Sequence, residues 1–383
     1  MTVWTVVAFV GGLVVLVGGA DLLVRGAATL ASRLGVSAVV VGLTVVAFGT
    51  SAPELVVSLD AAVSDQPGIA LGNVVGSNTV NVLLILGVSA VISGLVVAQR
   101  LLRREIPIMV AVSVALVVMA LDGRIGRVDG LLLVGAMVVY MVWLLRVARR
   151  ERPDVLAEYD AEVEAVERPT ARRPVWWLVG QIVVGLALLV VGGRLLVTAA
   201  TDAATALGVS ELVIGLTVVA VGTSLPELAT SVLAAIRGER DIAVANVLGS
   251  NIFNLLFVLG VASVASGSIA VGDAARRVDI PVMIAAAIVL VPMCWSRFSV
   301  ARWEGVALAL FYVAYVAYLV LDAADHDGAT LVGWGGVIAG GLVLLAATAA
   351  AVQTVRRSRH PGTPDTPDTP GTPDAAPAAP APT

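Results

Sequence analysis

Two glutamates stand inside long apolar stretches of the sequence, where a charged side chain is unexpected. Glu54 lies in the segment GLTVVAFGTSAPELVVS (42–58), and Glu227 lies in GLTVVAVGTSLPELATS (215–231). A carboxylate at such a position costs several kcal/mol unless it meets a cation, a proton or water. Their placement therefore predicts a cation- or proton-binding role, with a protonated carboxyl bonded to a neighbouring helix as the structural alternative.

A proline directly precedes each glutamate and predicts a break in the helix. Pro53 and Pro226 lack an N–H and clash with the carbonyl four residues earlier. Backbone carbonyls just before each break, near 47–50 and 220–223, are then expected to lack partners. With the carboxylates and nearby hydroxyls they would form an all-oxygen shell, which hard cations such as Ca²⁺ and Na⁺ prefer. The hydroxyls belong to Thr50, Ser51, Thr223 and Ser224.

A second pair of segments adds amides and hydroxyls to this prediction. The segments are NVVGSNTVNVLLILGV (73–88) and NVLGSNIFNLLFVLGV (246–261). Helical residues four apart share a face, so Ser77 with Asn81, and likewise Ser250 with Asn254, are expected to point together at the site. Hydrogen bonding between helices is the alternative role for these four residues. We expect their neighbours to point elsewhere, and these are Asn78 and Asn251.

The two sets of segments are copies of each other at an offset of 173 residues. The first pair is identical at 13 of 17 positions and the second at 10 of 16, which indicates an internal duplication. Each half carries five apolar spans. Because five is odd, the two copies must enter the membrane from opposite sides, which makes them an inverted repeat. Transporters built this way bind substrate near the bilayer midplane, where helices are interrupted.

Composition sets the class of protein that must position these residues. Of the 383 residues, 58% are hydrophobic and 14% charged, and the mean hydropathy is +0.97. These values predict an all-α polytopic membrane protein and exclude soluble enzymes and nucleic-acid binders. A single cysteine, Cys294, and two histidines, His326 and His360, argue against disulfides, zinc or iron. We therefore expect no enzymatic activity and no resident cofactor.

Eleven apolar runs are candidate membrane spans, long enough for helices to cross a bilayer. They lie near 3–24, 36–63, 69–97, 106–121, 129–145, 175–197, 209–236, 242–271, 280–295, 304–321 and 331–352. The predicted organisation is a 5+5 inverted-repeat core followed by an eleventh transmembrane helix without a copy. In order, it comprises a first five-helix repeat (1–147), a cytoplasmic linker with room for one short helix (148–173), a second repeat (174–322), the extra helix (331–352) and a disordered proline-rich tail (353–383).

The arginines predict how the chain is oriented in the membrane. With the N-terminus outside, 19 of the 24 arginines fall in cytoplasmic segments, as the positive-inside rule requires. The five left outside are Arg124, Arg127, Arg194, Arg276 and Arg277. We predict a multi-pass protein of the plasma membrane, with its N-terminus outside and its C-terminus in the cytoplasm. Its surroundings are the lipid bilayer, and it is expected to function as a monomer without nucleic-acid partners.

The paired motifs GTSAPE with GSNTVN, and GTSLPE with GSNIFN, resemble the alpha-1 (42–88) and alpha-2 (215–261) repeats of the Ca²⁺/cation antiporter superfamily. Within it, residues 3–322 are most similar to prokaryotic sodium/calcium exchangers. The resemblance implies that Glu54 and Glu227 hold Ca²⁺ with the carbonyls of Thr50 and Thr223. It also implies flanking Na⁺ sites, completed by the carbonyls of Ala47 and Ala220 and by Ser51, Ser77, Ser224 and Ser250. In that family the first and sixth spans slide to switch access, which assigns this movement to Gly18, Gly19, Gly192 and Gly193.

The resulting prediction is a secondary active antiporter that exchanges Na⁺ for Ca²⁺ by alternating access. One Ca²⁺ neutralises two glutamates, and exchange of three Na⁺ for one Ca²⁺ would be electrogenic. Asn254 stands where some relatives have an aspartate, which predicts K⁺ independence. The nearest rival hypothesis is an H⁺/Ca²⁺ antiporter on the same fold, although the hydroxyl-rich flanks favour Na⁺. Two weaker hypotheses are an intramembrane hydrolase that uses Glu54 and Glu227 as acid and base, and a non-transporting scaffold.

Overall fold

The computed structural model describes residues 3–165, 174–206, 220–323, 332–333 and 335. Within these residues, eight helical segments are long and apolar enough to cross a membrane. They are Trp4–Leu34, Pro67–Ser93, Leu101–Asp122, Arg127–Ala148, Val175–Ala206, Arg240–Ser266, Ala275–Trp295 and Arg302–Ala323. The predicted second span is a bent pair, Ala38–Thr50 and Ala52–Val63, and the described part of the seventh includes the short apolar helix Leu225–Ile236. The all-α polytopic fold is therefore confirmed.

Residues 3–165 contain eight α-helices, three π-helical segments, a 3₁₀ turn and two short strands. They are α1 (Val3–Leu34), α2 (Ala38–Val41), η1 (Gly42–Val46), α3 (Ala47–Thr50), α4 (Ala52–Val63), α5 (Pro67–Val80), η2 (Asn81–Leu86), α6 (Gly87–Ser93), β1 (Leu95–Val96), η3 (Leu101–Glu105), α7 (Ile106–Met119), η4 (Ala120–Asp122), β2 (Arg124–Gly126) and α8 (Arg127–Ala165).

Apart from the 3₁₀ turn η4, the second half repeats this order wherever it is described. Its elements are α9 (Val175–Ala206), α11 (Ala220–Thr223), α12 (Leu225–Ile236), α13 (Arg240–Phe253), η7 (Asn254–Val258), α14 (Leu259–Ser266), β3 (Ser268–Ala270), η8 (Ala275–Asp279), α15 (Ile280–Arg297), β4 (Ser299–Val300) and α16 (Arg302–Ala323). Even the π-helical segments recur, since η2 matches η7 and η3 matches η8. The duplication read from the motifs therefore extends to the local backbone.

The centre of the molecule is formed by the third span of each half. The helices running from α5 to α6 and from α13 to α14 are buried along most of their length, whereas α1, α8 and α16 are mostly exposed. Outer helices present large apolar side chains, such as Leu121 and Val139, which are 68% and 69% exposed. Such a surface suits contact with lipid chains, because a water-soluble protein rarely exposes apolar patches of this extent.

The two halves interlock through close helix contacts at glycines. A Cβ added at Gly305 of α16 would lie 2.5 Å from the Gly87 carbonyl of α6. At the equivalent contact between the other two spans, a Cβ added at Gly130 of α8 would lie 2.7 Å from the Gly260 carbonyl of α14. Real Cβ atoms do not approach backbone this closely, so only glycine permits these helices to touch. Each central span thus packs against the last span of the opposite half.

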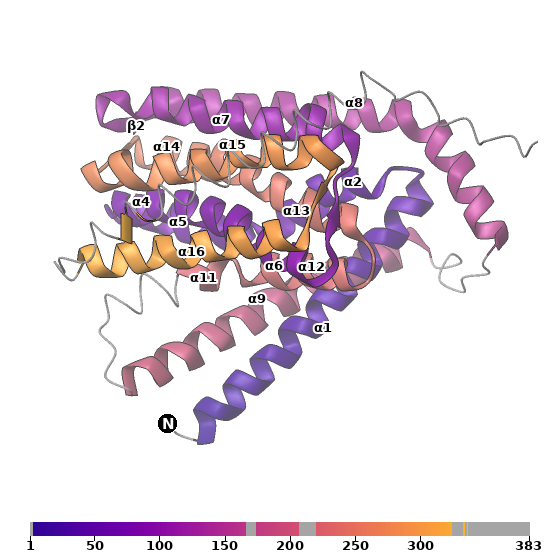
Figure 1. Ribbon diagram of the computed structural model, residues 1–383, viewed down its shortest axis with the longest axis horizontal. Coiled ribbons are helices and arrows are strands. Elements are labelled where there is room, and N and C mark those ends of the chain that lie inside the picture. Colours follow the sequence, from indigo (N-terminus) through magenta and orange to yellow (C-terminus); the bar gives the residue numbers. More distant parts are fainter. Residues whose placement is uncertain (1–2, 166–173, 207–219, 324–331, 334, 336–383) are drawn as a thin grey trace, which may run out of the picture.

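Helices α1 and α9 lie side by side and at an angle to the rest of the bundle (Figure 1). They are corresponding first spans of the two halves, and they run antiparallel, because Gly12 lies opposite Gly192 while Gly26 lies opposite Ile182. An antiparallel pair of corresponding helices is what an inverted repeat requires. The inference drawn from the odd number of spans therefore agrees with the structure.

The four glycines predicted to serve the sliding movement have different surroundings. Gly19 and Gly192 are in close backbone contact with the partner helix, where an added Cβ would meet atoms at 2.8 and 2.5 Å. An added Cβ at Gly193 would lie 3.9 Å from Leu225 and Pro226 of the central bundle, an ordinary contact, and at Gly18 it would meet nothing within 4 Å. Two of the four therefore join α1 to α9, and one faces the bundle.

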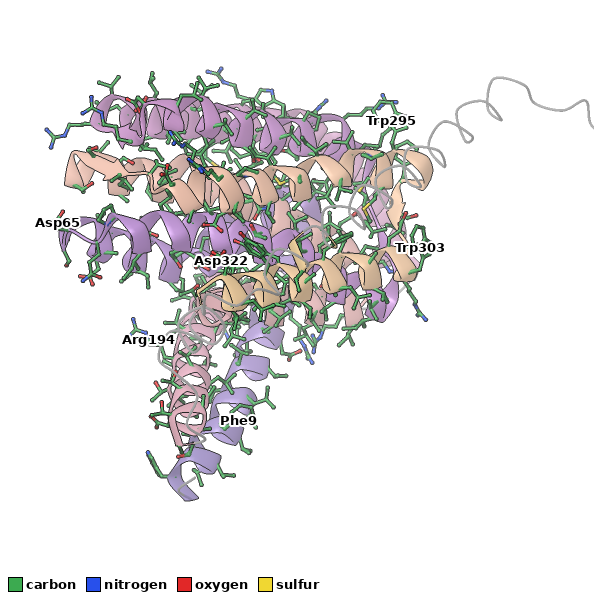
Figure 2. The ribbon with its side chains drawn as sticks, turned by 60° about the vertical axis from the view of Figure 1, so that its left-hand side comes forward. Phe9, Asp65, Arg194, Trp295, Trp303 and Asp322 are labelled. Atoms are coloured by element: carbon green, nitrogen blue, oxygen red, sulfur yellow. The ribbon has the colours of Figure 1, made fainter. Side chains whose placement is uncertain are left out.

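The connecting segments meet in pairs at opposite ends of the bundle. Strand β1 pairs with β4, and β2 pairs with β3, each antiparallel. Both β1 and β4 adjoin arginines predicted to be cytoplasmic, while β2 and β3 adjoin arginines predicted to be external. Trp295 and Trp303, about half exposed, lie at one end of the molecule and Asp65 at the other (Figure 2). Exposed tryptophans at a bundle end are typical of a membrane interface.

Two predicted regions differ from expectation or fall outside the described residues. Helix α8 continues to Ala165, so the first part of the predicted linker (148–173) extends the fifth span instead of forming a separate helix. That part is rich in Ala and Glu, which favour helix. The remaining linker residues 166–173, almost all of the predicted eleventh span (331–352) and the tail (353–383) lie outside the described residues.

Candidate functional site

Two helix breaks in the middle of the bundle build the site. Helices α3 and α4 meet at an angle of 44°, with Ser51 between them at φ −80° and ψ 5°. Helices α11 and α12 meet at Ser224 with nearly the same backbone angles, φ −89° and ψ 9°. The prolines lie in the first turn of α4 and α12, a position where a missing N–H is tolerated. The predicted breaks are confirmed, and each places its glutamate in the first turn of the second helix.

Glu54 and Glu227 are both completely buried. Their contacts cross between the halves: Ser224 Oγ donates to Glu54 Oε1 at 3.3 Å, and Ser51 Oγ donates to Glu227 Oε1 at 3.3 Å. The two carboxyl groups are close enough to repel each other when both are charged. Within the described chain, the second oxygen of each carboxyl group, Oε2, receives no hydrogen bond.

The threonines at the breaks are tied to the opposite half through asparagines. Thr50 Oγ1 lies 3.2 Å from Asn246 Oδ1, and Thr223 Oγ1 lies 3.3 Å from Asn73 Oδ1, each hydroxyl being the donor. Asn73 Nδ2 also donates to the backbone carbonyl of Glu54 at 3.2 Å. The sequence analysis does not identify Asn73 and Asn246 as site residues. The available signal is their position at the start of each duplicated segment.

The remaining predicted side chains are buried in the same region. Ser250 Oγ lies 3.4 Å from Thr50 Oγ1. Ser77 Oγ lies near the Glu54 carboxyl but outside hydrogen-bond geometry. Asn81 and Asn254 are fully buried, and among the described atoms neither Oδ1 accepts a hydrogen bond. The structure therefore gathers the duplicated hydroxyls, amides and carboxylates into one buried, oxygen-rich cluster.

The backbone carbonyls at the two breaks differ from each other. Ala47 O still accepts the Ser51 N–H at 3.0 Å and the Thr50 hydroxyl at 3.4 Å, so this carbonyl is not partnerless as the sequence suggested. At the second break the Ser224 N–H bonds to Val221 O at 3.1 Å, three residues back. The Ser224 amide therefore does not bond to the Ala220 carbonyl, which corresponds to Ala47. The second break is more tightly wound than the first.

Asn78 and Asn251 meet each other across the two halves. Asn78 Nδ2 donates to Asn251 O at 3.2 Å, and Asn251 Nδ2 donates to Asn78 O at 3.4 Å. This mutual contact joins α5 to α13, three residues before Asn81 and Asn254. The sequence does not predict these partners.

Two further acids, one buried and one half-buried, lie away from the cluster. Glu105 is completely buried, accepts a hydrogen bond from Tyr140 Oη at 2.8 Å and lies 4.0 Å from Arg100 Nε. Its counterpart in the second half, Asp279, accepts from Tyr315 Oη at 2.8 Å. The sequence gives no signal for Glu105, because it stands beside arginines at a span end.

The chain matches the family model for the sodium/calcium exchanger protein over residues 4–146 and 177–321. It is 38% identical over 277 residues to the putative antiporter CaxA of Alkalimonas amylolytica, covering 72% of this chain and 85% of that protein. It is 34% identical over 302 residues to the sodium/calcium exchanger MaX1 of Methanosarcina acetivorans, covering 71% and 86%. Solved structures of the sodium-calcium exchanger NCX_Mj superpose with a TM-score of 0.70 at 31% identity, covering 83% of this chain and 99% of that one.

A membrane transporter made of two interlocked, inverted halves is the class that this fold and its central cluster define. Substrate sites in this class lie between the halves at broken helices, which is where the two glutamates meet. Within that class, the chain belongs to the sodium/calcium exchanger family and is a cation antiporter. The predicted superfamily is thereby confirmed.

Proposed function

We propose that the protein exchanges Na⁺ for Ca²⁺ across the membrane by alternating access. The observation that carries the proposal is a set of buried oxygens that receive no hydrogen bond from the described residues and that converge from both halves. They are Glu54 Oε2, Glu227 Oε2, Ser77 Oγ, Asn81 Oδ1 and Asn254 Oδ1. Buried acceptors of this kind are costly to leave unsatisfied, and a hard cation satisfies several of them at once.

In this proposal Ca²⁺ binds between Glu54 and Glu227, with the carbonyls of Thr50 and Thr223 as further ligands. Na⁺ occupies flanking positions built from the same elements. These positions use the carbonyls of Ala47 and Ala220, the hydroxyls of Ser51, Ser77, Ser224 and Ser250, and the amide oxygens of Asn81 and Asn254. At Ala47 the second lone pair of the carbonyl serves the cation, since a carbonyl oxygen can accept more than one interaction.

Charge explains why the two cations exclude each other. The two carboxylates carry −2, one Ca²⁺ brings the site to neutrality, and three Na⁺ bring it to +1. The empty, doubly charged site is the poorest form to move through an apolar barrier. A loaded site therefore crosses, and an empty one stays, which is the condition for obligatory exchange. With three Na⁺ for one Ca²⁺, each cycle moves one net charge.

K⁺ has no assigned role in the proposed cycle. Asn254 supplies a neutral amide where some relatives of the superfamily carry an aspartate, so the site holds only the two glutamate charges. We infer K⁺ independence from this neutrality. We also place the protein in the plasma membrane as a monomer, N-terminus outside, with repeats at 1–147 and 174–322 joined by the cytoplasmic linker.

Radiotracer Ca²⁺ uptake into proteoliposomes tests the proposal. Vesicles holding purified protein are loaded with Na⁺ and diluted into Na⁺-free, K⁺-free buffer at equal pH on both sides. Uptake is expected to require internal Na⁺ and to be faster under an inside-positive potential, because three Na⁺ leave for each Ca²⁺ that enters. Uptake driven instead by an imposed pH gradient, and indifferent to Na⁺, would replace the proposal with H⁺/Ca²⁺ exchange.

A further inference from the structure

Two asparagines, Asn78 of α5 and Asn251 of α13, form a closed hydrogen-bonded ring, and two more, Asn81 of η2 and Asn254 of η7, attach to it. Beside the mutual contact of Asn78 and Asn251, Asn81 Nδ2 donates to Asn251 Oδ1 at 2.9 Å, and Asn254 Nδ2 donates to Asn78 Oδ1 at 3.1 Å. All four residues are at most 2% exposed. Every bond crosses from one half to the other, so the ring is a shared feature of the duplicated core.

The direction of every amide in the ring follows from two backbone carbonyls. A carbonyl can only accept, so the amides of Asn78 and Asn251 must turn their NH₂ groups toward Asn251 O and Asn78 O. The Asn251 NH₂ group also lies 3.4 Å from Met109 Sδ, another acceptor. With their nitrogens engaged, these two asparagines present Oδ1 to Asn81 and Asn254. Those two amides must then supply NH₂ to the ring and turn their own Oδ1 away from it.

We propose that Asn78 and Asn251 are positioning residues, which hold the amide oxygens of Asn254 and Asn81 toward the transported cation. The proposal rests on the proposed function, because it assumes a cation beside Glu54 and Glu227. Asn81 lies one helical turn beyond Ser77, whose hydroxyl is beside the Glu54 carboxyl, and Asn81 Oδ1 is buried without a donor in the described chain. A flipped amide would aim an NH₂ group at the cation, and its positive hydrogens would repel the ion.

The ring therefore gives the site a preference for cations that does not depend on a further negative charge. A freely rotating asparagine offers an oxygen or an NH₂ group. Held by the ring, Asn81 and Asn254 each offer only the amide oxygen to the cation. Asn78 and Asn251 need not contact the ion, since Asn78 acts through Asn254 and Asn251 acts through Asn81, each in the opposite half. Outer residues that orient metal ligands commonly change affinity by 10- to 100-fold when removed.

A double-mutant cycle on Ca²⁺ transport tests this inference. Asn251→Ala removes the acceptor that orients Asn81, and Asn81→Ala removes the oxygen itself. Each single variant is expected to raise the KM for Ca²⁺ by about tenfold. The double variant Asn81→Ala, Asn251→Ala is expected to be no worse than either single, because both act through one oxygen. Effects on KM that multiply in the double variant would overturn the positioning role.

Thr79→Ala is the matched control, because Thr79 is buried on the same helix and its hydroxyl bonds only within that helix, to Val75 O at 2.9 Å. It should leave the KM for Ca²⁺ unchanged, and a rise equal to that of Asn251→Ala would show that any polar truncation here acts through packing. Glu54→Gln separates the two claims. If Glu54→Gln still exchanges Ca²⁺ normally, the proposed function fails. If Glu54→Gln is inactive but the KM effects of Asn81→Ala and Asn251→Ala multiply in the double variant, the proposed function stands and only the positioning role of Asn251 fails.

Discussion

Two pairs of duplicated acids in this molecule have different surroundings. The carboxyl groups of Glu54 and Glu227 at the helix breaks accept hydrogen bonds from serines of the opposite half and lie close enough to repel each other when charged. Glu105 and Asp279 instead accept tyrosine hydroxyls, and Glu105 also faces Arg100. Burial alone therefore does not distinguish a transport site from a structural contact.

The difference lies in what the protein supplies to balance each acid. A buried carboxylate with a positive partner and a phenol is stabilised by the fold itself. A buried pair of carboxylates with only hydroxyl partners repel each other and need a cation or protons from outside. The same chain thus contains acids that hold helices together and acids that are reserved for cargo. Substituting each kind tests this contrast.

The largest effect is expected at the central pair. Glu54→Gln or Glu227→Gln keeps the shape of the side chain but removes half of the negative charge that binds Ca²⁺. Exchange should fall by at least about 100-fold, corresponding to loss of a charged ligand worth about 3 kcal/mol. The measurement is Na⁺-driven Ca²⁺ uptake at equal amounts of folded protein. A variant that is folded and transports at the wild-type rate contradicts the contrast at its strongest point.

Glu105→Gln should have the reverse outcome. The amide still accepts the Tyr140 hydroxyl but no longer balances Arg100, so we expect a stability loss of about 2 kcal/mol. Thermal unfolding of the purified protein in detergent would show the loss as a lower midpoint. Transport per folded molecule should stay near the wild-type value. Normal stability with abolished exchange would place Glu105 among the transport residues.

The crossed serines should produce a smaller effect. Ser224→Ala removes the hydrogen bond to Glu54, and Ser51→Ala removes the equivalent bond to Glu227. A hydrogen bond to a charged group contributes about 1.5 kcal/mol, so the KM for Ca²⁺ should rise by about tenfold in each variant. Because the halves are duplicated, the two variants should behave alike. A large effect in one and none in its counterpart would show that the two carboxylates are not equivalent.

The smallest effect is expected for Asp279→Asn. The amide oxygen continues to accept the Tyr315 hydroxyl. The nearby Arg276 is bonded to Asp273 at 2.7 Å. We expect stability to change by less than about 1 kcal/mol, which is the typical range for substitutions that keep their contacts. The thermal midpoint should stay close to that of the wild type, and above that of Glu105→Gln. A larger stability loss in Asp279→Asn than in Glu105→Gln would show that the ion pair with Arg100 is not what makes Glu105 more important for stability.

Much of the fold follows from the sequence because it depends on local or additive properties. Span positions follow from apolar length, and the inversion follows from five spans per copy. The breaks follow from Pro53 and Pro226, whose rings act on their own helices. Contacts between the halves do not follow in this way. The asparagine ring and the Tyr315 to Asp279 bond depend on which helices cross and at what height, which no local pattern encodes.

The site shows the same division. Glu54, Ser51 and their copies can be named from residue type and duplication, since an acid inside an apolar span is costly unless it binds a cation or a proton. Asn73 and Asn246 cannot, because an asparagine near a span end is common. Only the structure shows that each one bridges to the threonine of the opposite break. The Ala47 carbonyl was expected to be free, but Ser51 supplies an amide that the proline rule does not remove.

Ca²⁺-dependent stabilisation of the purified protein tests most directly the claim that the central acids alone are reserved for cargo. Thermal midpoints of the wild type, Glu105→Gln and the double variant Glu54→Gln, Glu227→Gln are measured in detergent with excess Ca²⁺ and with a chelator. A ligand at 100 times its Kd stabilises a folded protein by about 2.7 kcal/mol. We predict a Ca²⁺-dependent rise for wild type and Glu105→Gln and none for the double variant. An equal rise in the double variant would contradict the account.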